Sequence, residues 1–109
     1  MLDEQEFRKR ADDALAALNR ALISAADDYG FEVDFNAGAL TIEFEEPPGK
    51  FVVSPNAPPR QIWVSAQSKS YKLDWDHVAA SFVHTDSGQT LLHLIEEAIG
   101  RQIGEDVNL

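Results

Sequence analysis

The chain has 109 residues, with 19 acidic and 9 basic side chains that give a formal charge of −10 at pH 7. This length predicts a single domain over residues 1–109, and an apolar fraction of 44% excludes wholesale disorder. The negative charge argues against binding to nucleic acid or to anionic membranes, because both are bound through Lys and Arg. Since the chain has no cysteine, disulfides, thiolate metal ligands and cysteine nucleophiles are excluded.

The charge is concentrated in the N-terminal part of the chain. Residues 1–46 carry 12 acidic and 4 basic side chains, a net charge of −8, whereas residues 47–109 carry 7 and 5, a net charge of −2. A solvated surface that keeps the protein soluble accounts for such a charge. The asymmetry also marks the N-terminal part as a candidate surface for cations or basic proteins.

The spacing of apolar residues predicts a helix over residues 3–27, followed by two strands. In the helix they recur at i, i+3 and i+4, and Gly30 is placed to end it in a left-handed conformation. The period then changes to two in residues 31–35 and 40–45, which predicts strands joined by a hairpin at residues 36–38. Each of these strands has one apolar and one acidic face.

The rest of the chain predicts four further strands and a second helix. A turn at residues 47–49 leads into a short strand at residues 51–53, and the Pro-rich residues 54–59 are expected to form a rigid connector outside the sheet. The other strands are predicted at residues 61–66, 71–75 and 80–84. The second helix is predicted at about residues 89–102 and ends at Gly104.

The predicted order is therefore helix, six strands, helix, without alternation of strands and helices. Such an order indicates an α+β fold with a single antiparallel sheet. Each helix has one apolar stripe and the sheet has one apolar face, so we expect both helices to pack on the same face of the sheet.

The sequence contains no recognisable catalytic constellation. His77, His84 and His93 lack the spacing of metal ligands, and there is neither a nucleophile elbow nor a phosphate-binding glycine loop. We therefore expect a protein that is not an enzyme, with these histidines as ordinary surface residues.

Carboxylates come in pairs along the acidic part of the chain. Two pairs are adjacent residues of the predicted helix or its end, Asp12 and Asp13, and Asp27 and Asp28. Two further pairs share the exposed face of a predicted strand: Glu32 and Asp34, and Glu43 and Glu45. Oxygen ligands without His or Cys suit Mg²⁺, Ca²⁺, Mn²⁺ or iron, bound weakly and partly hydrated. From the residues alone, both a specific metal site and an ordinary acidic surface remain open.

A tryptophan occupies the polar phase of the strand predicted at residues 61–66. If the apolar phase faces the helices, Trp63 stands on the open face of the sheet between Gln61 and Ser65. An exposed Trp is a candidate for an interface, because Trp is enriched at binding hot spots. The alternative is the opposite phase, with Trp63 in the core.

Several segments resemble the frataxin family. Residues 36–42 (Asn-Ala-Gly-Ala-Leu-Thr-Ile) are similar to the family's hairpin, and residues 58–63 are similar to its Pro-x-x-Gln-(Ile/Val)-Trp signature. Residues 74–75 and 86–91 resemble the approach to the family's second helix. The resemblance covers about residues 4–107 and implies two helices packed on one antiparallel sheet, with a role in iron handling and iron–sulfur cluster assembly.

The resemblance also implies which residues carry this role. Family members bind iron weakly through an acidic ridge, and contact cysteine desulfurase and the cluster scaffold protein through that ridge and the exposed sheet. The implied ligands for reversibly bound Fe²⁺ or Fe³⁺ are Asp12, Asp13, Asp27, Asp28, Glu32 and Asp34. The implied partner-binding residues are Asn56, Gln61 and Trp63.

The chain departs from the family in the second half of the first helix. Many bacterial members carry a dense acidic run there, where the matching positions are Asn19, Arg20, Ile23 and Ser24. We therefore expect two acidic patches, at residues 12–13 and 27–34. The alternatives are an acidic interaction module without physiological metal binding and, as a third, a weak ferroxidase. We expect a monomer, and the absence of a transit peptide favours a cytoplasmic bacterial protein over the mature form of an organellar one.

Overall fold

Two helices and seven strands make up the fold in a computed structural model that describes residues 2–109. The helices are α1 (Glu4–Tyr29) and α2 (Leu91–Ile103). The strands are β1 (Phe31–Asn36), β2 (Ala39–Glu45), β3 (Pro48–Asn56), β4 (Gln61–Ala66), β5 (Lys69–Asp76), β6 (Ser81–His84) and β7 (Gln89–Thr90). They form one sheet in chain order, with every neighbouring pair antiparallel. The predicted α+β class is confirmed.

Local hydrogen bonds fix both ends of α1. Asp3 Oδ1 accepts a hydrogen bond from the Glu6 N–H at 2.8 Å, which satisfies one of the free N–H groups of the first turn. Gly30 has a φ of 75° and donates its N–H to the carbonyl oxygen of Ala26, as expected for a left-handed C-terminal cap. The predicted helix is confirmed and extends two residues further toward this cap.

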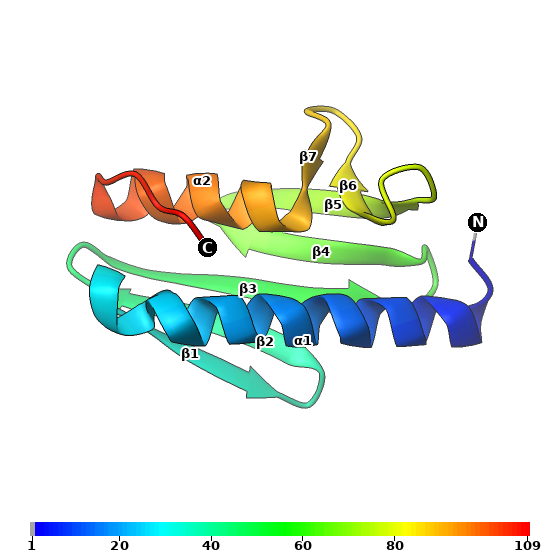
Figure 1. Cartoon of the computed structure of the whole chain (residues 1–109), viewed down its shortest axis with the longest axis horizontal. Helices are drawn as coiled ribbons and strands as arrows, with labels where there is room; N and C mark the ends of the chain where they lie inside the picture. The colour runs from blue at the N-terminus through cyan, green and yellow to red at the C-terminus, as the bar shows by residue number, and fades with distance from the viewer. Residues whose placement is uncertain (1) are drawn as a thin grey trace.

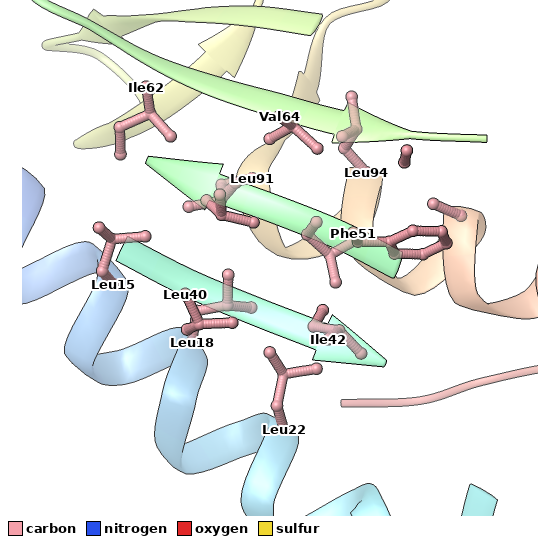
Figure 2. Close-up of a cluster of buried hydrophobic side chains, with 14 of the residues drawn as sticks. Leu15, Leu18, Leu22, Leu40, Ile42, Phe51, Ile62, Val64, Leu91 and Leu94 are labelled. Carbon is pink, nitrogen blue, oxygen red and sulfur yellow. The ribbon is translucent and has the colours of Figure 1, made fainter. Parts of the chain in front are cut away.

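Both helices lie on one face of the sheet, with α1 nearer to β1 and α2 nearer to β6 and β7 (Figure 1). Figure 2 shows leucines of α1 pointing toward apolar side chains of the strands. Core residues shared by α1, β2 and β3 are at most 3% exposed: Leu15, Leu18, Leu22, Leu40, Ile42 and Phe51. The predicted packing is confirmed. Within residues 2–109, neither helix is long and apolar enough to cross a membrane.

The Pro-rich segment at residues 54–59 was predicted wrongly in its first half, while residues 57–59 lie in the turn between β3 and β4. The first half is not a connector outside the sheet, because β3 continues to Asn56 and pairs there with β4. Pro55 is tolerated because β2 pairs with β3 no further than Val53, so its missing N–H breaks no hydrogen bond to a neighbouring strand. The turn predicted at residues 47–49 also lies earlier in the chain, because β3 already begins at Pro48.

The start of the second helix differs from its prediction at residues 89–102. The first two of these residues form β7, which pairs with β6, and α2 begins at Leu91. The Thr90 side chain accepts a hydrogen bond from a backbone N–H of the first turn and caps the helix. The six predicted strands are therefore seven, while the helix ends at Gly104 as predicted.

Two adjacent residues of α1 test the face that it buries. Leu22 is fully buried, whereas Ile23 is 58% exposed. We expect Leu22→Ala to lower the free energy of unfolding by about 2–5 kcal/mol, because it removes buried methyl groups and leaves a cavity. Ile23→Ala should change it by less than about 0.5 kcal/mol. Urea unfolding measures both, and equal losses would contradict this assignment of the buried face.

Candidate functional site

The sheet face that the helices leave uncovered carries the predicted partner-binding residues. On β4, Gln61 and Trp63 alternate with the buried Ile62 and Val64, and Trp63 is 38% exposed. The alternative with Trp63 in the core is therefore excluded. Asn56 lies on the neighbouring strand directly opposite Gln61, so the structure brings the three predicted residues together on one surface.

Side-chain contacts hold Trp63 in position on this face. Its Nε1 donates a hydrogen bond to Gln61 Oε1 at 2.9 Å, and Gln61 Nε2 donates to Asp74 Oδ1 at 3.2 Å. Lys72 Nζ lies 5.0 Å from the centroid of the Trp63 ring, close enough for a cation–π interaction. The cross-strand partner of Trp63 is Lys72, and that of Gln61 is Asp74. The indole is thus held directly by Lys72 of β5 and by Gln61, which Asp74 of β5 holds in turn.

Neither Lys72 nor Asp74 was predicted from the sequence as a residue of the site. They lie two residues apart in the strand predicted at residues 71–75, so a shared face was predictable. Which residues of β4 they face depends on the register, and the register depends on the turn between β4 and β5. Gln67 and Ser68 form this turn with φ values of 54° and 64°, and neither is the glycine that usually signals such a hairpin.

The six carboxylates implied as iron ligands are all exposed, and they come from two neighbouring elements. Four belong to α1: Asp12, Asp13, Asp27 and Asp28. Glu32 and Asp34 belong to β1, where they alternate with residues that face the helices and therefore project from the open face. The patch predicted at residues 27–34 therefore spans the last turn of α1 and the adjacent edge strand β1.

No three His, Asp or Glu side chains within residues 2–109 are arranged to hold a metal ion. Asp13 also forms an ion pair with Lys9, whose Nζ lies 3.0 Å from Asp13 Oδ2. Between the two aspartate pairs, α1 presents the exposed Ile23. The geometry therefore offers separate carboxylate pairs that leave most of a cation's coordination sphere to water, rather than an enclosed site.

Like charges face each other on the open face of the first hairpin. Glu32 lies directly opposite Glu43, while Asp34 lies opposite Thr41. The cation nearest in register is Lys50, opposite Glu43 on β3, and none of these charged residues forms an ion pair with another residue of the described chain. Because directly opposed like charges destabilise a sheet, this surface is not optimised for stability.

The fold and these surfaces define an acidic α–β sandwich with a tryptophan on its open face. Residues 1–105 match the Frataxin-like domain family. The iron-sulfur cluster assembly protein CyaY of Pseudomonas aeruginosa is 34% identical over 100 residues, which are 90% of this chain and 92% of that protein. CyaY of Dechloromonas aromatica is 31% identical over 108 residues, 99% of each chain. The chain belongs to the frataxin family.

More distant relatives agree with this assignment. The mitochondrial frataxin of Arabidopsis thaliana is 29% identical over 113 residues, which cover 100% of this chain and 60% of the plant protein. A solved structure of frataxin from Psychromonas ingrahamii has a TM-score of 0.77 and 24% identity, covering 98% of this chain and 97% of that one. At this identity the likeness concerns the fold, and it confirms the sandwich expected from the sequence.

The register of the first hairpin can be tested by charge reversal. We expect Glu32→Lys to raise the free energy of unfolding by about 0.2–1 kcal/mol more than Asp34→Lys, because only position 32 faces a carboxylate. Both variants change the net charge equally, so Asp34→Lys is the matched control. Urea unfolding at low salt measures the difference, which should shrink in 1 M NaCl. Equal effects would contradict the register.

Proposed function

We propose that this protein acts in iron–sulfur cluster assembly in the bacterial cytoplasm, as a weak iron donor or as a regulator. The observation that carries the proposal is Trp63, exposed on the open face within the Gln-Ile-Trp segment typical of the family. Relatives that bear the name iron-sulfur cluster assembly protein match nearly the whole chain. The partners we propose are cysteine desulfurase and the cluster scaffold protein.

Iron is proposed as cargo held at the carboxylate pairs. Each pair offers a few hard oxygen ligands, so water completes the coordination shell of Fe²⁺ or Fe³⁺. Without His or Cys among the ligands, binding is expected to be weak and exchange fast. These properties suit delivery, because a donor must release its ion to an acceptor. We propose no catalytic step for the chain.

Docking is proposed to combine long-range attraction with one preformed anchor. The charge of −8 over residues 1–46 attracts a basic partner surface and raises the association rate. The Trp63 ring is already held by Gln61 and Lys72, so less side-chain entropy is lost on binding. A large, rigid, partly exposed aromatic side chain is a typical hot spot.

A second candidate function is an acidic interaction module without physiological metal binding. The absence of any three-residue ligand group within residues 2–109 favours it, and so does the exposed Ile23 between the two aspartate pairs of α1. In this alternative the carboxylates steer partners and carry no ion. The two candidates differ in the response of the carboxylate pairs to Fe²⁺.

Iron binding can be followed by NMR under anaerobic conditions. With millimolar Fe²⁺ we expect two sets of perturbed signals, one around Asp27 and Asp28 and one around Glu32 and Asp34, because these pairs are the proposed ligands. The double variant Asp27→Asn/Asp28→Asn should remove the first set and leave the second. Unchanged signals at both pairs would sink the iron proposal and leave the interaction module.

Partner docking can be tested at the exposed indole. We expect Trp63→Ala to weaken binding to a desulfurase–scaffold complex about 30-fold, the loss typical of a hot-spot residue. Ser65→Ala, on the same face of β4, is the matched control and should bind within about twofold of the unaltered protein. Titration calorimetry measures both, and circular dichroism checks that each variant is folded. Equal affinities of the two variants would refute the docking role of Trp63.

A further inference from the structure

β1 is a free edge of the sheet. It stands first in the strand order, and all six of its residues pair with β2 without a bulge (Figure 1). It contains neither proline nor glycine. A free edge presents unpaired N–H and C=O groups, which can template a further strand. At the other edge β7 has only two residues, so β1 is the edge that can accept a strand.

The turn between β1 and β2 determines which backbone groups face outward. Ala37 and Gly38 have φ values of 54° and 80°, as a two-residue type I′ turn requires. Asn36 and Ala39 then form its hydrogen-bonded closing pair, and such pairs alternate with non-bonded pairs along the ladder. The groups that point away from β2 therefore belong to the alternate residues Phe31, Val33 and Phe35.

The open face of this edge is acidic, and the nearest cation in register is Lys50, two strands away on β3. Glu32 lies opposite Glu43, and Asp34 lies opposite Thr41. Neither Glu32 nor Asp34 forms an ion pair with any residue between 2 and 109. A strand added outside β1 would place its own side chains directly beside these two carboxylates.

The helix face of the same edge is apolar and partly exposed. Phe35 of β1 is 38% exposed, and Ile23 of α1 is 58% exposed. One flank of α1, with Ala17 and Ala21, faces α2 and lines a cavity of about 410 Å³ with Leu92. Since successive helix residues are about 100° apart, Ile23 lies on the other flank, toward β1.

We propose that β1 binds an extended segment of another protein as an added antiparallel strand, in which basic residues alternate with apolar ones. The added strand forms its hydrogen bonds with the outward backbone groups of β1. Glu32 and Asp34 then stand in non-hydrogen-bonded pairs with it, where opposing side chains are closest. Lys or Arg at the facing positions pairs with them, and the intervening apolar residues meet Phe35 and Ile23. A second copy of the chain fits worse, because its own β1 carboxylates would oppose these two. The inference does not depend on the proposed iron or desulfurase function.

The test uses a capped peptide, Thr-Lys-Val-Arg-Val-Lys-Thr, titrated into the full chain and followed by NMR and amide hydrogen exchange. We expect shifts and slower exchange at the amides of Phe31, Val33 and Phe35. Glu32→Gln/Asp34→Asn should weaken binding about three- to tenfold through loss of two cross-strand pairs. Asp76→Asn/Asp86→Asn removes the same charge from the opposite side of the sheet and should bind within twofold of the unaltered protein.

Two control peptides separate strand addition from plain charge attraction. One is N-methylated at the amides that face β1 and the other has its basic residues grouped at one end; both keep the net charge, and both should bind at least tenfold more weakly. Equal binding of either control, or unchanged β1 amides at millimolar peptide, overturns the proposal. So does concentration-dependent dimerisation in sedimentation that Phe35→Pro abolishes, since the occupant is then a second copy of this chain.

Discussion

The burial of one sheet face beneath two helices is the constraint on which the rest of the structure depends. In a strand, successive side chains point to opposite faces, so once Ile62 and Val64 are buried against the helices, Gln61 and Trp63 must face the other way. The same alternation sends Glu32 and Asp34 to the open face. The positions of the functional residues are therefore consequences of core packing, and no separate device is needed to expose them.

The features that depend on the spacing of apolar residues and on helix caps could be predicted from the sequence. Helix α1, its Gly30 cap and the exposure of Trp63 follow from spacing and from one glycine. Features that depend on what lies beside a strand could not. Pro55 looked incompatible with a sheet because the sequence does not show that β2 stops pairing with β3 at Val53. The neighbours of Trp63 on β5 depend on a turn that contains no glycine.

The acidic edge also illustrates a conflict between stability and surface chemistry. A sheet is stabilised by opposite charges across strands and weakened by like charges, yet Glu32 and Glu43 face each other. Local choices that oppose the fold tend to occur where a surface serves another purpose. The same charges protect a free edge from pairing with itself. One arrangement thus limits aggregation and selects partners of opposite charge.

The geometry limits what a single partner can touch. β1 and β4 are three strand spacings apart, about 14 Å, so a partner lying flat on the open face can reach both Trp63 and Glu32. The aspartates of α1 belong to the helix layer on the other face of the sheet. A partner that contacts both groups does so at the β1 edge, where α1 packs against β1. Acidic side chains thus lie in both layers, and the β1 edge is where the helix layer and the sheet meet on this side of the molecule.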